Sequence, residues 1–440
     1  MSTTGEELVG VLPPFIRRTL GVRSPRRFRY DTLVRVRAGE PVFLLTHPDD
    51  VRHVLVGNAE GYTKTPRLVG ASGRRRVGHG VLTATGGEHL RQRRLLQPLF
   101  RREAVTVIAG AVEDVVDRAL DRWHASSRVD LASEMESVAK GVILTTLFGR
   151  DLDEDAYGSL ARDIAVRRRY TELVHHGRLP FRDRLPTPVV RAHREALARL
   201  DTTIGEAVAV RRAAPHERDD LLARLLQATY DDGSTMPERL VRDEALTLMT
   251  TGYETLGEAL MWVFVLLGHH PDADEAVAAE ASRVALAAAG VEHLPVTERV
   301  LSEALRLYPP TWLYARVPRG DDVLPVGGKV RSGSTLYVCP YVLHRHPRLF
   351  QEPERFDPQR FAPDARLPRY VYLPFGDGLH RCLGEHLARL EAVLVIARVA
   401  RQVRLVPDSG RPVVPRAGVT LGARRPVWAR PAPRRIGTAA

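Results

Sequence analysis

Residues 375–384 read Phe-Gly-Asp-Gly-Leu-His-Arg-Cys-Leu-Gly and lead into a regular apolar pattern. Leucine and alanine recur every three or four residues from 383 to about 400, which predicts a helix. Cys382 stands immediately before it, where unpaired amide groups and the helix dipole favour a thiolate, and the glycines let the backbone approach a flat group. Three interpretations of Cys382 follow: an inert buried residue, a metal ligand, or a nucleophile with His380 or His386 as its base.

A second helical pattern runs from Asp243 to Gly268 and has one apolar stripe. Its centre departs from what a buried helix prefers, because Gly252 costs about 1 kcal/mol relative to alanine. A buried Glu254 carboxylate would also need a partner. Two interpretations follow: Glu254 and Thr255 lie on a wetter face, or they form a polar notch opposite a ligand.

Together these segments resemble the cytochrome P450 family of heme-thiolate monooxygenases. The offsets in 375–384 are those of the family's heme-binding loop, which would give cofactor-binding roles to Phe375, Gly376, His380, Cys382 and Gly384. Cys382 would then be the iron ligand. Thr251-Gly-Tyr-Glu-Thr255 resembles the family's oxygen-activating segment, although the family more often has alanine or glycine where Thr251 stands. The resemblance implies that Glu254 and Thr255 deliver protons during catalysis.

Two further segments fit the same resemblance. Glu303 and Arg306 resemble the family's buried Glu-x-x-Arg pair, and Pro353-Glu-Arg-Phe356 resembles the segment that donates a second arginine, here Arg355. The implied group is a structural triad of Glu303, Arg306 and Arg355. Loss of one partner from a buried ion group costs about 3–5 kcal/mol.

The segment Gly87-Glu-His-Leu-Arg-Gln-Arg-Arg94 is similar to the family's helix that holds a heme propionate. His89 stands where the family has tryptophan, and Arg93 follows one helical turn later. Arg316 and His380 fall where the family places further propionate contacts. A guanidinium suits this task because its parallel N–H groups match a carboxylate.

The implied fold is mainly α with small β-sheets: a single-domain cytochrome P450 fold with heme between a long distal helix and a proximal Cys-bearing helix. We expect an N-terminal segment at 1–27 and a heme domain at 28–427. We expect a disordered, basic, proline-containing tail at 428–440. Alternating residues at 34–45 predict two short strands, and a helix is expected from about Pro48.

The implied activity inserts one atom of O2, by hydroxylation or epoxidation, into a hydrophobic small molecule of secondary metabolism, such as a terpenoid or polyketide. The implied cofactors are heme b (iron protoporphyrin IX), O2 as cosubstrate, and NAD(P)H electrons passed on by an acidic ferredoxin and its reductase. A substrate tethered to a carrier protein remains an alternative. We expect the substrate pocket to be lined by Leu248, Thr251, Gly252, Trp312, Leu313 and Tyr314.

Composition limits the other classes of protein. The 440 residues carry a formal net charge of +12 with only three lysines, so the basicity is an arginine skew spread along the chain. We therefore expect an acidic protein partner, contacted by Arg91 and Arg94, and no nucleic acid. Two cysteines and no membrane anchor predict a cytoplasmic monomer. A thiol hydrolase using Cys382 and His386 remains the other enzyme class, but it leaves the Glu303 and Thr255 patterns unexplained.

Overall fold

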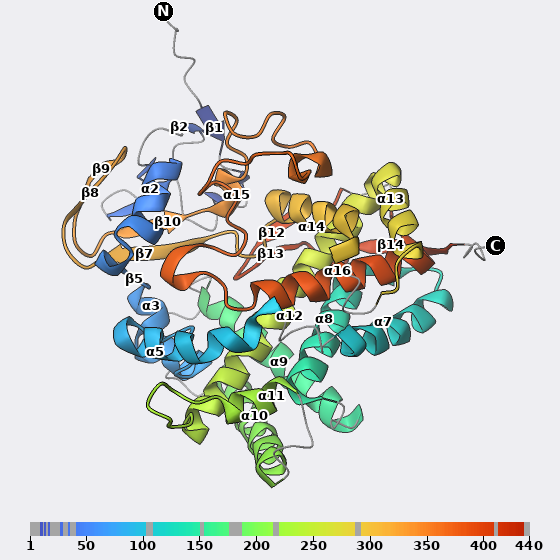
Figure 1. Cartoon of the computed structure of the whole chain (residues 1–440), viewed down its shortest axis with the longest axis horizontal. Helices are drawn as coiled ribbons and strands as arrows, with labels where there is room; N and C mark the ends of the chain where they lie inside the picture. Colours follow the sequence, from blue (N-terminus) through green and yellow to red (C-terminus); the bar gives the residue numbers. More distant parts are fainter. Residues whose placement is uncertain are drawn as a thin grey trace, which may run out of the picture. The chain divides into compact units, whose positions relative to one another are not determined.

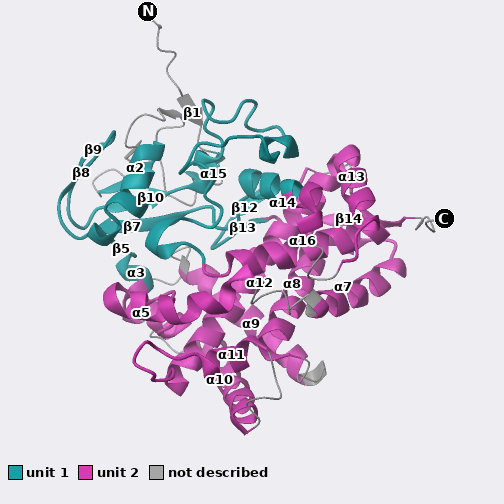
Figure 2. Cartoon of the chain, in the orientation of Figure 1, with its two compact units in different colours: residues 1–68, 299–382, 415–422 teal, residues 69–298, 383–414, 423–440 magenta. Residues whose placement is uncertain are grey.

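The computed structural model describes residues 9–11, 13–14, 16–17, 27–29, 34–35, 41–102, 109–149, 154–175, 187–213, 220–286, 292–408 and 412–434. Figure 1 shows the elements in sequence colours, and Figure 2 shows two compact units. Unit 1 comprises residues 1–68, 299–382 and 415–422, and unit 2 comprises 69–298, 383–414 and 423–440. Neither unit is a continuous stretch, so a search for linkers along the sequence could not separate them.

Unit 1 contains most of the β-structure. Its main sheet has the strand order β3-β4-β10-β7-β5, in which β10 runs parallel to β4 and antiparallel to β7. The strands are β1 (Val9–Val11), β2 (Arg27–Arg29), β3 (Val34–Arg35), β4 (Val42–Leu45), β5 (Tyr62–Thr63), β7 (Tyr314–Pro318), β8 (Asp322–Leu324), β9 (Gly328–Val330), β10 (Thr335–Val338), β12 (Pro415–Ala417) and β13 (Leu421–Ala423), the last of which ends in unit 2. The two short strands predicted at 34–45 are confirmed.

Short helices connect these strands. They are α2 (Pro48–Arg52), the π-turn η1 (His53–Gly57), η2 (Ala59–Gly61), α3 (Pro66–Val69), α15 (Pro340–Leu343), η7 (Pro358–Phe361), η8 (Gly378–His380) and most of α14 (Pro295–Leu307). The predicted helix at Pro48 is confirmed, with proline in the first turn, where its missing N–H costs nothing.

Unit 2 is a helical assembly with one small sheet. Its helices are α4 (Ala71–Val77), α5 (Gly86–Leu96), η3 (Gln97–Phe100), α7 (Ala109–His124), α8 (Leu131–Phe148), α9 (Glu154–His175), α10 (Pro188–Ala213), α11 (Leu221–Gln227), α12 (Glu238–His269), α13 (Pro271–Ser282) and α16 (Glu385–Gln402). Its sheet has the order β11-β14-β6, formed by β11 (Val403–Pro407), β14 (Trp428–Pro433) and β6 (Val129–Asp130).

The long helix α12 lies at the centre of unit 2 and packs along α8 (Figure 1). Gly257 permits the close approach, because a Cβ there would lie 3.2 Å from the Glu136 Cα and the Met135 carbonyl oxygen. The predicted helix at 243–268 is confirmed and extends further at its N-terminus. Among the described residues, no helix is both long and apolar enough to cross a bilayer.

The prediction of a disordered tail from 428 is wrong for residues 428–433. They form β14, the middle strand of its sheet, and Ala429 is fully buried. Arg434 then pairs with Asp274 and with Glu275, the latter at 2.6 Å. Arg434, which the sequence places in a solvated tail, therefore pairs with two acidic residues of α13, which lies far away along the chain. Residues 435–440 lie outside the described part.

Candidate functional site

The cysteine loop of unit 1 is closed by its own backbone. The Cys382 N–H donates to the Phe375 carbonyl at 2.9 Å. Gly376 and Gly378 both have φ of 67°, in the left-handed region that favours glycine. A Cβ at Gly378 would lie only 1.8 Å from the Leu55 carbonyl oxygen, so a larger residue does not fit. The glycines thus hold the loop that presents Cys382.

The two cysteines have opposite environments. Cys339 is buried, and burial raises the pKa of its thiol to about 12. Cys382 is exposed. The helix after it begins at Glu385 with Gly384 as N-cap, so the expectation that Cys382 immediately precedes the helix is wrong by two residues. Cys382 is therefore the cysteine accessible to a ligand.

Arg316, on β7, is a buried cation with no acidic partner among the residues that the structure describes. Its side chain is 8% exposed, and its Nη1 donates to the neighbouring Ala315 carbonyl at 2.9 Å. Burial lowers the pKa of Arg316, and the guanidinium lies 5.3 Å from the centre of the Tyr314 ring. The buried Tyr314 hydroxyl has no hydrogen-bond partner within the described parts of the chain. Unit 1 thus offers an anion such as a heme propionate a positive charge and a donor.

Glu303 and Arg306 form the buried ion pair that the sequence predicts. Both side chains are 0% exposed, and Arg306 donates through Nε (2.7 Å) and Nη2 (2.9 Å) to the two carboxylate oxygens. Arg306 Nη1 also donates to the His344 and Pro353 carbonyls at 2.9 and 2.7 Å. The pair therefore fixes the segment that follows β10.

The third member is Arg360 rather than Arg355. Arg360 Nε lies 3.5 Å from Glu303 Oε1, whereas the Arg355 side chain is 63% exposed and pairs with Glu352 at 2.9 Å. Arg355 contributes its backbone carbonyl, which accepts from Arg306 at 3.1 Å. The motif Pro-x-Arg-Phe occurs twice, at 353–356 and 358–361, so the sequence signal for Arg360 was present but ambiguous.

One face of α12 is open although most of the helix is buried. Four residues on one side of the helix are partly buried or exposed: Leu248, Thr251, Gly252 and Thr255. We call this set the α12 stripe. The Thr255 hydroxyl donates to the Thr251 carbonyl at 2.7 Å, which leaves its oxygen lone pairs as acceptors. The stripe carries no charge, and it contains the predicted alcohol.

Glu254 lies on a different face of α12, about 100° around the helix from Thr255. Its side chain is 12% exposed, and its Oε1 lies 3.8 Å from Arg168 Nε. Arg168 also donates to Glu136 at 2.7 Å, and Lys140 lies 2.8 Å from the same carboxylate. Burial opposes ionisation of Glu136, but Arg168 and Lys140 outweigh it and lower its pKa to about 2. Glu254 is thus a largely buried acid with a basic neighbour, which does not fit the first sequence interpretation, a position on a wetter face.

Helix α5 holds two of the other predicted propionate residues, and the third, His380, lies in η8 of unit 1. His89 is buried, and Arg93 is half-buried one turn later on the same face. Arg91 is exposed and pairs with Asp232 at 2.9 Å, while Arg94 lies 3.9 Å from Asp231. The two arginines expected to meet a partner therefore already have acidic neighbours in this chain.

The turn before β7 and the first residue of that strand carry three of the residues that the sequence predicts to line the substrate pocket, Trp312, Leu313 and Tyr314. Trp312 is 1% exposed, belongs to an apolar core cluster, and donates its indole N–H to the Gly418 carbonyl at 3.2 Å. Its prediction as a lining residue is wrong, because the turn points this ring into the core. Leu313 and Tyr314 are partly buried and pack on the cores of unit 1.

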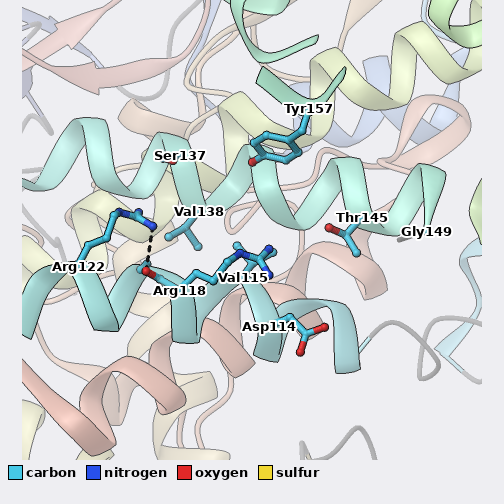
Figure 3. Close-up of a pocket in the computed structure, with 10 residues that line it drawn as sticks. Asp114, Val115, Arg118, Arg122, Ser137, Val138, Thr145, Gly149 and Tyr157 are labelled. Atoms are coloured by element: carbon cyan, nitrogen blue, oxygen red, sulfur yellow. Dashed lines mark hydrogen bonds between the residues drawn. The ribbon is translucent and has the colours of Figure 1, made fainter. Parts of the chain in front are cut away.

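A groove that the sequence does not predict lies among α7, α8 and α9 of unit 2 (Figure 3). Its volume is about 550 Å³, and its lining mixes Val115 and Val138 with Arg118, Arg122 and Tyr157. The Arg122 guanidinium donates to the Arg118 carbonyl at 2.9 Å. The lining residues include none of the predicted site residues.

Comparison with known proteins gives a match along most of the chain. Residues 26–425 match the profile of the family described as Cytochrome P450. Cyclooctatin synthase of Streptomyces melanosporofaciens is 34% identical over 431 residues, covering 94% of this chain and 93% of that protein. Cyclooctat-9-en-7-ol 5-monooxygenase of the same organism is 32% identical and covers 90% and 89%. Pentalenene oxygenase of Streptomyces avermitilis is 30% identical and covers 88% and 87%.

A solved structure shares the fold. Retinoic acid bound cyanobacterial CYP120A1 superposes with a TM-score of 0.80, covers 89% of each chain, and is 24% identical in sequence. The predicted architecture, mainly helical with small sheets, is confirmed by this likeness.

Proposed function

The chain belongs to the cytochrome P450 family and is a monooxygenase of that family, and we propose that it oxidises a terpene hydrocarbon or terpene alcohol in secondary metabolism. The observation that carries this proposal is the match to three proteins, two of them named as oxygenases, over 87–93% of their lengths. The names of the two oxygenases specify an alkenol and an alkene as substrates. The uncharged α12 stripe supports the same chemistry, because apolar and hydroxyl groups accommodate a hydrocarbon skeleton without burying an unpaired charge.

The cofactor of this family is heme b, and the residues present fit it. Bound to a cysteine thiolate, its iron activates dioxygen so that one oxygen atom enters the substrate and the other leaves as water. We propose Cys382 as the ligand, since it is the exposed cysteine on a glycine-shaped loop. Arg316 would bind a propionate, which would supply the acid that its buried guanidinium lacks within the described part of the chain. His89, Arg93 and His380 are the remaining propionate candidates.

Proton delivery would fall to the α12 stripe. The Thr255 hydroxyl already donates its hydrogen to a helix carbonyl, so its oxygen would accept a hydrogen bond from a water molecule and hold that water in place. Glu254 would act indirectly, through the charge cluster with Arg168 that it shares with Glu136. Thr255 is thus the group proposed to position the proton, and Glu254 is the acid proposed to supply it.

The substrate proposal is tested with labelled dioxygen. The purified protein, supplied with ferredoxin, reductase and NAD(P)H, is offered cyclic terpene hydrocarbons, their alcohols and fatty acids of similar size. We expect a terpene product that contains one labelled oxygen atom. Oxidation of the fatty acids alone would contradict the proposed substrate class but not the monooxygenase activity.

The Thr255→Ala variant tests the proposed proton step. We expect unchanged heme binding and less product for each NAD(P)H consumed, with peroxide accounting for the difference. A positioned proton donor contributes about 10²- to 10⁴-fold to such a step. The matched control is Thr202→Ala on α10, whose hydroxyl makes the same contact to a helix carbonyl on an exposed surface. Equal coupling in the two variants would contradict the role of Thr255.

A further inference from the structure

Residues 76–81 of unit 2 are held by side chains that bind their backbone. Arg167, on α9, donates through Nε and Nη2 to the Arg76 carbonyl at 3.3 and 3.2 Å. Its Nη1 donates to the Thr250 hydroxyl of α12 at 2.6 Å. Arg167 is 3% exposed, and although burial lowers its pKa to about 10, it stays charged at neutral pH. One guanidinium thus joins α9, the end of α4 and α12.

Two consecutive carboxylates of α12 hold the same segment from the other side. Asp243 Oδ2 accepts the His79 N–H at 2.7 Å, and Glu244 Oε1 accepts the Val81 N–H at 2.8 Å. Both carboxylates are 0% exposed. Between these contacts, a Cβ at Gly80 would lie 2.8 Å from Glu244 Oε2, so the backbone approaches α12 as closely as glycine permits.

This arrangement is costly unless it is fully formed. A buried charge that loses its hydrogen-bond partner strongly destabilises the folded state. The contacts to residues 76, 79 and 81 all reach main-chain atoms, so they hold the path of the backbone whatever side chains these three positions carry. Glu244 precedes Leu248 by one helical turn, so the segment that it binds lies next to the N-terminal end of the α12 stripe.

We propose that Arg167, Asp243 and Glu244 are positioning residues for substrate selection. They clamp residues 76–81 against the N-terminal end of the α12 stripe and so limit the size of the apolar molecule that the stripe accepts. This inference rests on the proposed function only where it concerns substrate. The clamp itself is a property of the backbone and is measured separately.

Amide hydrogen exchange on the heme-loaded full chain tests the clamp. We expect Arg167→Met and Glu244→Leu to increase exchange at residues 79–83 at least tenfold. Glu244→Gln should restore protection, since its amide oxygen still accepts the Val81 N–H. The matched control is Arg169→Met, an exposed arginine on the same helix, which should change nothing. If Arg167→Met or Glu244→Leu does not fold, Arg167→Lys is tested instead, because its ammonium group can make fewer than the three hydrogen bonds of the Arg167 guanidinium.

Binding of imidazole and of the bulkier 1-phenylimidazole, followed by heme absorbance, tests selection. We expect the ratio of the two dissociation constants to differ at least threefold from the native ratio in Arg167→Met and Glu244→Leu. In Glu244→Gln the ratio should equal that of the native protein. Increased exchange with an unchanged ratio would overturn the role in selection, and unchanged exchange would overturn the clamp. A protein that binds no heme would refute the proposed function, while amide exchange measured on the heme-free full chain would still decide the clamp.

Discussion

Glu391, on α16, is a buried carboxyl with a single hydrogen-bond partner in the described chain. It accepts from the Thr146 hydroxyl at 3.3 Å, and burial raises its pKa to about 8, an effect that this hydrogen bond only partly offsets. In the unfolded chain the same group ionises near 4.5. Between these values the native state holds a proton that the unfolded state has lost, so stability falls as pH rises through this window.

The Glu391→Gln variant removes this titrating group and keeps a side chain of the same shape. We expect its free energy of unfolding, relative to that of the native protein, to increase by about 1.4 kcal/mol for each pH unit between roughly 5 and 8. Urea denaturation of both proteins at pH 5.5 and 7.5 measures the difference. An advantage that stays constant with pH would show that Glu391 is not protonated in the native state.

Arg360 and Arg355 form a second test at the scale of single residues. Arg360→Ala removes a buried neighbour of Glu303, so we expect a loss of about 1–3 kcal/mol in the free energy of unfolding. Arg355→Ala removes an exposed pair with Glu352 and should cost less than about 0.5 kcal/mol. The opposite ranking in denaturant titrations would restore Arg355 as the triad member.

Sequence patterns predicted the residues whose role depends on local spacing. The glycine-rich loop at Cys382 and the Glu303–Arg306 pair are placed as expected because loop offsets and helical turns are local properties, although the helix after Cys382 begins two residues later than predicted. Arg355 and Trp312 were predicted wrongly because the direction of a side chain after a proline turn depends on distant packing. The backbone clamp on 76–81 has no local signature.

At the scale of elements, the crossing of α8 and α12 depends on Gly257. Gly257→Ala should destabilise the protein by about 1–3 kcal/mol, since the added carbon meets backbone atoms that cannot rotate away. Gly205→Ala, in the interior of α10, is the matched control, because nothing lies within 4 Å of its added carbon. That variant should gain up to about 1 kcal/mol from helix propensity. Equal effects in thermal unfolding would refute the role of close packing.

Long helices were the elements best predicted from sequence. The apolar repeat in α12 extends over many turns, whereas the start of α16 is set by the Leu383–Gly384 turn, which has no periodicity to read. β14 was missed because its arginines and prolines resemble a solvated tail. Its residues nevertheless alternate between buried and exposed positions, the period-two pattern of a strand.

For the whole molecule, the formal net charge of +12 supports our proposal that an acidic ferredoxin supplies the electrons. Such steering is screened over about 10 Å at 0.1 M salt, so electron-transfer rates should fall as salt rises. Arg91→Glu should slow transfer. Asp232→Asn should accelerate it by releasing Arg91 from its acidic neighbour. Arg199→Glu, on α10, is the control. Electron-transfer rates that do not change with salt, with Arg91→Glu or with Asp232→Asn would exclude a ferredoxin docking surface at Arg91.

The central claim is that Cys382 binds heme iron as a thiolate, and the carbon monoxide spectrum of the reduced protein tests it most directly. We expect an absorbance band near 450 nm, the wavelength in the family's name, in the native protein and in Cys339→Ala. Cys382→Ser should lose that band while it still folds. A native protein that binds heme without the band, or a Cys382→Ser variant that keeps it, would contradict the account.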